Sequence, residues 1–186
     1  MIFGHPAAFA IEIGVIERFS DSTDLFVQFR FRIGGCAIGD WDDRISLIAS
    51  IENSVIVCKN EHYRREYSFE FLDSHDAFRA AYDAFFSYDY STDPILIPSL
   101  RDRFHLDWIG MGAIQDKYGV LILQNSPNSD RIIVKDLNNG NFVVDILIKT
   151  RSVDNTLSDY ITWFKARQEG EEKGTGAHNG DAAKGG

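Results

Sequence analysis

The sequence predicts an α+β fold in which a largely antiparallel β-sheet, ending in a C-terminal meander, is covered by two or three α-helices. Three observations predict it. Several short segments alternate apolar and polar residues, as half-buried strands do. Gly34-Gly35 and Asn139-Gly140 are typical of tight turns between antiparallel strands. The second half has only short polar turns between its strand-like segments, which leaves no place for the helices that connect parallel strands. We expect one domain over residues 1–168 and a tail over 169–186.

Three strands are predicted before residue 40. The first covers residues 8–18, and the second covers residues 25–33, where apolar and polar side chains alternate without interruption. The apolar face of the second strand carries Val27, Phe29, Phe31 and Ile33. Gly34-Gly35 then turns the chain into a short strand, CAIG, which ends at the segment Asp40-Trp41-Asp42-Asp43.

Two helices are predicted in the middle of the chain. Apolar residues at helical intervals predict the first, from Leu47 to Lys59, although residues 55–57 also fit a strand. Residues 67–71 alternate like a strand, and Ser74 is then a candidate N-cap. The helix that it would begin carries Phe78, Tyr82, Phe85 and Phe86. Two prolines within residues 88–99 predict an exposed connection.

The C-terminal part reads as four strands, a helix and a tail. Phe104, Leu106 and Trp108 alternate with His105 and Asp107, and the segments GVLILQ, RIIVKD and FVVDILIKT follow after short turns. Together they predict an antiparallel meander. A last helix over residues 154–167 would cover one face of the sheet. From Glu169 onward the chain is rich in glycine and has no large apolar residue, so we expect it to be disordered.

Charge and composition limit the class of function. The chain has 19 basic and 28 acidic residues and a formal net charge of -9, which disfavours binding to nucleic acid or to an anionic membrane and favours a basic protein partner. Cys36 and Cys58 are expected to be reduced core thiols. No apolar stretch reaches the roughly 18 residues of a membrane helix, and the N-terminus has no basic leader. We therefore expect a cytoplasmic protein.

No motif predicts a cofactor, a metal site or a nucleotide-binding loop. The five histidines form neither an HExxH motif nor a pair on one helix face. His105 and Asp107 would share one face of a strand, as a general base and its carboxylate do, and a small enzyme using this face is one alternative. An ordinary exposed strand face is the other interpretation of the pair. A third alternative is a structural or oligomeric subunit, which would have an exposed apolar strand edge.

Two predicted loops mix carboxylates with aromatic side chains. Such a mixture suits an interface in which aromatic residues become desolvated and carboxylates meet lysine or arginine. Solvated acids beside aromatic residues that enter the core are the alternative. The candidate binding residues are Asp40, Trp41, Asp42, Asp43, Tyr88, Asp89, Tyr90 and Asp93.

The N-terminal segments also resemble the immunity protein 42 family of bacterial polymorphic-toxin systems. The matching residues are Ile2, Phe3, Gly4 and Pro6, then Phe9, Ala10 and Ile11, and in the second strand Phe29, Phe31, Ile33 and Gly34. The segments GVLILQNSPNSDRIIVKD and GNFVVDILI, with Arg131, are similar to the closing strands of that family. The shared N-terminal residues look structural, with Gly4 and Pro6 in a turn and Phe9 and Ile11 in the core.

The resemblance implies a cytosolic, non-catalytic protein that binds the toxin domain encoded beside it. Many such toxins are nucleases and therefore basic, and an acidic inhibitor gains association rate and complementarity against them. We therefore expect an immunity protein that neutralises a basic, nuclease-type toxin C-terminal domain by stoichiometric occlusion, without cofactor, nucleic acid or membrane.

Overall fold

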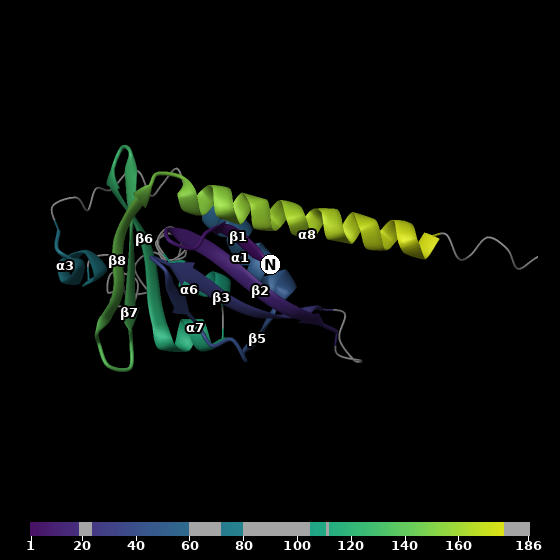
Figure 1. The fold of residues 1–186 in the computed structure, drawn as a ribbon, viewed down its shortest axis with the longest axis horizontal. Helices are drawn as coiled ribbons and strands as arrows, with labels where there is room; N and C mark the ends of the chain where they lie inside the picture. Colours follow the sequence, from purple (N-terminus) through teal and green to yellow (C-terminus); the bar gives the residue numbers. More distant parts are fainter. Residues whose placement is uncertain (19–23, 60–71, 80–104, 111, 177–186) are drawn as a thin grey trace, which may run out of the picture.

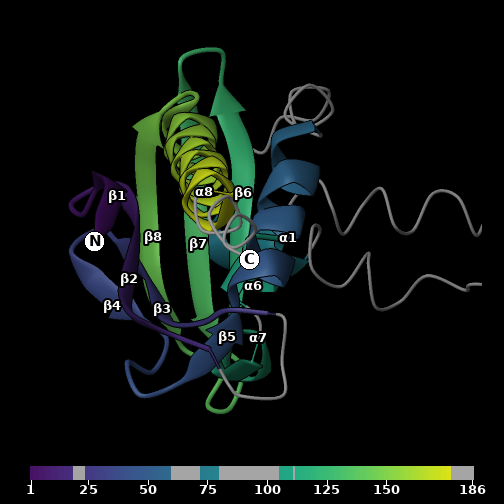
Figure 2. The same ribbon diagram turned by 90° about the vertical axis from the view of Figure 1, so that its right-hand side faces the viewer.

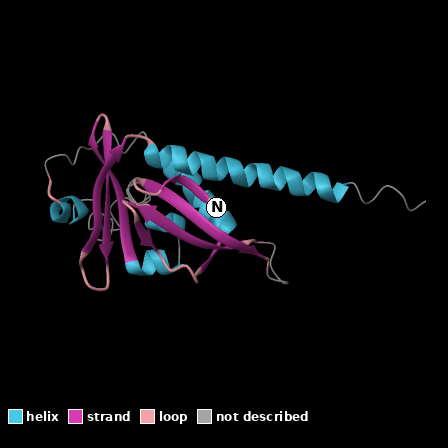
Figure 3. Ribbon diagram, in the orientation of Figure 1, coloured by secondary structure: helices cyan, strands magenta, loops and turns pink. Residues whose placement is uncertain are grey.

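The chain forms two antiparallel sheets with helices packed against them (Figures 1 and 3). This computed structural model describes residues 1–18, 24–59, 72–79, 105–110 and 112–176. The α+β class predicted from the sequence is confirmed. The N-terminal sheet contains β1 (Ile2–His5), β2 (Phe9–Glu17), β3 (Phe26–Ile33), β4 (Cys36–Ile38) and β5 (Arg44–Ser46). The C-terminal sheet contains β6 (Tyr118–Ser126), β7 (Ser129–Asp136) and β8 (Phe142–Lys149).

β3 is the central strand of the N-terminal sheet. One edge of β3 pairs with β2, and the other pairs with both β4 and β5, which lie end to end along it. β4 pairs with Phe31–Ile33 and β5 with residues 26–28, so the loop between β4 and β5 passes the middle of β3. The alternation of β3 places Phe29 and Phe31 in the core and Arg30 and Arg32 on the outer face.

Five helices occur in the described residues. The predicted helix from Leu47 to Lys59 is confirmed as α1, and the last helix, α8, covers the start of the N-terminal sheet and projects past it (Figure 1). The aromatic side chain of Tyr160 on α8 is fully buried and its ring centroid lies 5.3 Å from that of Phe3. The helices are α1 (Leu47–Lys59), α3 (Ser74–Phe78), α6 (Asp107–Gly110), α7 (Gly112–Lys117) and α8 (Ser152–Gly176).

The C-terminal sheet is apolar on both faces. One face joins the main core, which lies between the two sheets and the helices α1 and α8. The opposite face carries Leu121, Leu123 and Ile133, which form a smaller cluster with Ala77 and Phe78 at α3. Because side chains on both faces are buried, β6 has a nearly continuous apolar sequence instead of an alternating one.

A partly exposed ion pair attaches the segment around α3 to the C-terminal sheet. Arg131 on β7 donates to Asp145 on β8 through Nε at 2.7 Å and Nη2 at 2.6 Å, and its Nη1 donates to the backbone oxygen of Leu72 at 2.7 Å. Ser74 also hydrogen-bonds the Asp145 carboxylate. These contacts with Arg131 lower the pKa of Asp145 below its usual value.

Several predicted boundaries change in the structure. The predicted first strand over 8–18 corresponds to β2, and the short strands β1 and β5 were not predicted. The predicted N-cap Ser74 is wrong, because Asp73 is the N-cap and its carboxylate accepts the backbone N–H of Asp76 at 2.8 Å. The core placement of Cys36 is wrong too, since this thiol is exposed on the short strand β4. Both cysteines are free thiols, as expected.

The meander has three strands instead of the predicted four. The segment that contains Asp107 begins the helix α6, and only an isolated bridge joins His105 to Leu121 on β6. At the C-terminus, α8 continues past Arg167 to Gly176, because adding turns to a helix already held by packing costs little. The predicted strand over 67–71, the aromatic residues Tyr82, Phe85 and Phe86, and the connection over 88–99 lie outside the described residues.

Candidate functional site

The segment of Asp40, Trp41, Asp42 and Asp43, called the acidic loop below, connects β4 to β5. β4 and β5 both pair with the same edge of β3, one at each end of that strand. The loop that connects them therefore runs along this edge, past the middle of β3. It therefore lies beside the middle of β3, where Arg30 is on the outer face. The side chains of Asp40 and Asp42 are exposed, while Trp41 and Asp43 are half-buried.

Hydrogen bonds within the acidic loop fix its backbone. The Asp40 carboxylate accepts the backbone N–H of Asp42 at 3.0 Å, and the Asp40 carbonyl accepts that of Asp43 at 3.3 Å. The Asp43 carboxylate accepts the N–H of Arg44 at 3.0 Å and lies against Gly112 at the start of α7. Such local bonds are typical of aspartate in turns. Asp43 therefore has a structural role, whereas Asp40 and Asp42 present carboxylate oxygens to solvent.

The ring of Trp41 lies on the outer face of the N-terminal sheet. The guanidinium of Arg30 lies over it, 4.2 Å from the ring centroid, as in a cation–π contact. The ring also passes directly over Gly14 on β2, where a Cβ would come within 2.8 Å of it. A residue with a side chain at this position would displace the indole. Trp41 is thus held by β2 and β3 and remains partly exposed.

Glu12 on β2 holds Arg30 in this position. Its carboxylate accepts from Arg30 Nε at 2.8 Å and from Arg32 Nε at 2.6 Å. The pKa of Glu12 is lowered from 4.5 to about 2, and the hydrogen bond from Arg30 is the main cause. Burial acts in the opposite direction and raises the pKa, while the hydrogen bond from Arg32 lowers it further. The carboxylate stays ionised at neutral pH and fixes both guanidinium groups.

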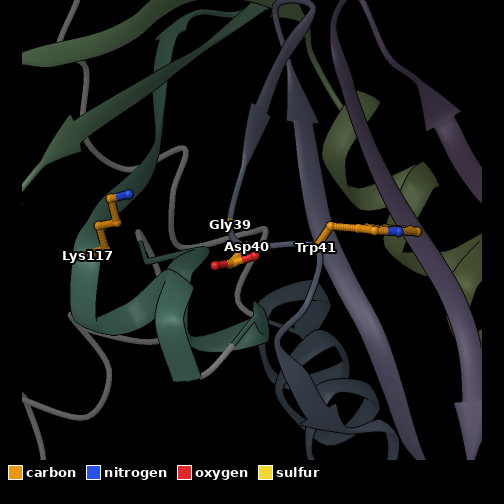
Figure 4. A pocket seen from close by; sticks show the side chains of 4 residues that line it. All are labelled: Gly39, Asp40, Trp41 and Lys117. Atoms are coloured by element: carbon orange, nitrogen blue, oxygen red, sulfur yellow. The ribbon is translucent and has the colours of Figure 1, made fainter.

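A pocket of about 260 Å³ opens beside the acidic loop and is lined by Gly39, Asp40, Trp41 and Lys117. In Figure 4 the Asp40 carboxylate lies between Trp41 and the α7 residue Lys117, and the Trp41 side chain points toward the strands of the N-terminal sheet. An anion and an aromatic ring on one side and an ammonium group on the other suit the polar side chains of a protein partner. Sequence reasoning missed Lys117, because only the fold brings α7 to this loop.

The second predicted loop, with Tyr88, Asp89, Tyr90 and Asp93, lies outside the described residues. His105 and Asp107 do come together, with Nδ1 and Oδ1 3.4 Å apart, but their side chains are only 1% and 5% exposed. Asp107 accepts the backbone N–H of Val120 at 3.2 Å and so joins α6 to β6. A general base must reach its substrate, so this buried pair does not form the open catalytic face considered above.

No group of three or more His, Cys, Asp or Glu side chains in the described part of the chain is placed to hold a metal ion. None of the described helices is long and apolar enough to cross a membrane.

Comparison with protein families identifies the family of the chain. The sequence profile of the family described as Immunity protein 42 matches residues 1–163, which include both sheets and the acidic loop. The chain belongs to this family. It is therefore an immunity protein, a non-enzymatic inhibitor that neutralises a toxin protein. The family match ends within α8, at the last turns that pack against the sheets.

The immunity protein is also similar to a solved structure, the crystal structure of CdiI from Burkholderia dolosa AUO158. The TM-score is 0.60, with 14% sequence identity, and the match covers 87% of this chain and 99% of that chain. At this identity the likeness shows the shared fold alone. None of the curated proteins compared with the chain matches it.

Proposed function

We propose that the immunity protein binds the C-terminal domain of its cognate toxin one to one in the cytoplasm and occludes its active site, with the acidic loop as part of the contact surface. The observation that carries the proposal is the geometry of this loop. Asp40 and Asp42 are exposed on a backbone fixed by hydrogen bonds, next to a pocket and a half-buried tryptophan.

The chemistry of the loop favours a basic, nuclease-type toxin. A nuclease binds phosphate groups through lysine and arginine, and carboxylates presented on a protein surface compete for the same cationic groups. The net charge of -9 adds long-range attraction, which raises the association rate. The exposed part of Trp41 supplies apolar contact area beside these carboxylates. We also propose that Tyr88, Asp89, Tyr90 and Asp93 belong to the contact surface.

The test compares two double variants with the same change in charge. Asp40→Asn with Asp42→Asn removes the exposed carboxylates of the loop, and Asp159→Asn with Glu169→Gln removes two exposed carboxylates of α8. Asp43 is left unchanged because it hydrogen-bonds the backbone of Arg44. The partner is the purified C-terminal domain of the toxin encoded next to the immunity gene, about 150 residues long.

We expect the loop variant to raise the dissociation constant at least about tenfold, which corresponds to about 1.4 kcal/mol. It should also reduce the dependence of affinity on salt, since fewer ion pairs form. The α8 variant should change affinity by less than about twofold. Equal effects of the two variants would remove the acidic loop from the contact surface. Failure of the unaltered protein to bind the folded toxin domain or to abolish its toxicity would refute the proposal as a whole.

A further inference from the structure

The C-terminal sheet has one covered edge and one open edge. At β6, the backbone oxygen of Val120 accepts the N–H of Leu106 at 2.8 Å, and its N–H donates to Asp107 at 3.2 Å, so the segment around α6 covers that edge. At the opposite side, β8 pairs with β7, and no strand in the described part of the chain pairs with its other edge (Figure 2). Every second residue of β8 therefore directs its backbone N–H and C=O groups toward this open edge.

The side chains of β8 do little to protect this edge. The strand has no proline, and Leu147 is 62% exposed, the largest exposure among the large hydrophobic side chains described. Asp145 is held against Arg131 of β7 by two hydrogen bonds, and the contact lowers the pKa of its carboxyl, so it remains ionised at a fixed position. A bulge at Val143 and the charge of Lys149 limit the unprotected edge to residues 144–148, a regular and largely apolar stretch that is a template for pairing with another strand.

The sequence of β8 is complementary to itself in the antiparallel direction. Asp145, Leu147 and Lys149 point to one face of the strand, because they are two residues apart. When two copies are related by a two-fold axis at Leu147, this leucine meets Leu147 of the second copy, and each Asp145 lies opposite Lys149 of the second copy. On the other face, Ile146 lies opposite Ile148 of the second copy. The Asp145–Lys149 and Ile146–Ile148 pairs are then each formed twice, and the Leu147 pair on the axis is formed once.

We propose that two copies of the immunity protein associate through β8 in this register and form one continuous sheet with three strands from each copy. A two-fold contact of this kind closes on itself, because it uses the only open edge of the C-terminal sheet in the described residues and leaves none for a third copy. The acidic loop belongs to the other sheet, so dimer formation and toxin binding use different surfaces. The contact of a single strand pair is small, and we expect a dissociation constant in the micromolar range.

Sedimentation velocity between about 1 and 500 μM tests the association. We expect the unaltered protein to pass from monomer to dimer over this range. Leu147→Lys should keep the protein monomeric, because it places two ammonium groups at the two-fold axis. Val15→Lys is the matched control, since Val15 is 55% exposed but lies in the N-terminal sheet, and it should not change the association. Circular dichroism and thermal unfolding verify that both variants fold.

Charge and cross-linking test the register. Lys149→Glu places like charges opposite each other twice and should weaken the dimer roughly tenfold, whereas Lys165→Glu on α8 should have no effect. In a Cys36→Ser background, Leu147→Cys should form a covalent dimer on mild oxidation, because directly opposed Cα atoms are about 4.5–5.5 Å apart, within the range that a disulfide spans. Val143→Cys should not, since eight residues of offset along the strand separate the two copies by about 27 Å.

A protein that remains monomeric at all concentrations would overturn the proposal. So would a dimer that Leu147→Lys leaves intact, or a covalent dimer that forms equally from Val143→Cys. If the protein is monomeric but Leu147→Lys weakens its binding to the toxin domain, the open edge pairs with the toxin instead of a second copy, and the proposal is wrong. Toxin binding itself is measured with the acidic-loop variants, so failure of the dimer does not affect that test.

Discussion

The contact of Glu12 with two arginines gives a prediction that can be worked out in detail. Glu12→Gln keeps the shape of the side chain but removes its charge. Each lost ion pair is partly exposed, with side-chain exposures of 20% for Arg30, 29% for Arg32 and 16% for Glu12. Solvent therefore screens both pairs, and partly exposed pairs with good geometry contribute up to about 1 kcal/mol each. We expect the free energy of unfolding of this variant to be about 1–2 kcal/mol lower than that of the unaltered protein at pH 7.

The pH dependence of this difference has a definite sign. Binding to Arg30 and Arg32 lowers the pKa of Glu12 in the folded protein to about 2, below the value of 4.5 in an unfolded chain. The stabilisation is therefore complete above about pH 4.5 and decreases as the pH falls from there toward about 2. Because glutamine does not titrate, the difference between the two proteins should become smaller over the same interval.

Urea unfolding followed by tryptophan fluorescence at pH 7, 5 and 3.5 measures these differences. At neutral pH the midpoint of thermal unfolding should fall by about 2–8 °C, given the size of the protein. Glu17→Gln is the control, since its contact with Arg44 is longer, at 3.4 Å, and more exposed. We expect it to cost less than about 0.5 kcal/mol. A loss in Glu12→Gln that equals the control, or that does not change with pH, would refute this reasoning.

Two further predictions concern a glycine with a positive φ and a buried tyrosine. Gly4→Ala should destabilise the protein by more than about 2 kcal/mol, because Gly4 has φ +84° and its Cβ would lie 2.3 Å from Thr156 Oγ1. Gly35→Ala, with the same φ but nothing within 4 Å, should cost only about 1 kcal/mol, and equal losses in urea unfolding would contradict the packing argument. Tyr160→Phe should cost about 1 kcal/mol at pH 7, because its hydroxyl contacts Ser50 Oγ at 3.3 Å. Burial raises the pKa of Tyr160, so the unaltered protein should lose stability above about pH 10, where tyrosine in the unfolded chain ionises, and the variant should lose less over pH 9–11. Parallel pH curves would contradict this assignment.

Elements with a long, regular pattern could be predicted from the sequence. The alternation of β3 and the helical spacing of α1 extend over eight and 13 residues, and both elements have the expected type and nearly the expected bounds. β1 and β5 contain only four and three residues, too few for a period to show, and they exist because neighbouring strands pair with them.

The error at His105 and Asp107 has a similar cause. Alternation over five residues fits a strand, but residues 107–110 form the short helix α6. Leu106, just before this helix, and Ile109 within it are buried three positions apart. The Asp107 carboxylate caps a backbone N–H of β6, a contact that no local pattern contains. Long-range contacts of this kind decide the structure of such short segments.

The acidic loop was predicted from its composition, but its arrangement was not. The position of Trp41 depends on Arg30 and Gly14, which come from two different strands. These residues meet only because β4 and β5 share one edge of β3, and this pairing has no signal in the sequence around Trp41. Composition therefore indicated which residues form the loop. Which residues of other strands contact it could be seen only in the structure.

The hydrogen bonds within the acidic loop have a consequence for the thermodynamics of recognition. Ordering the backbone of one free residue costs about 1–2 kcal/mol at room temperature. In this loop, bonds from Asp42 and Asp43 to Asp40 have already removed that freedom when the protein folds. A partner that binds here does not have to order the loop again, so more of the contact energy is available for affinity. Because the loop is already ordered before binding, the gain in affinity should appear mainly as a slower dissociation rate of the complex.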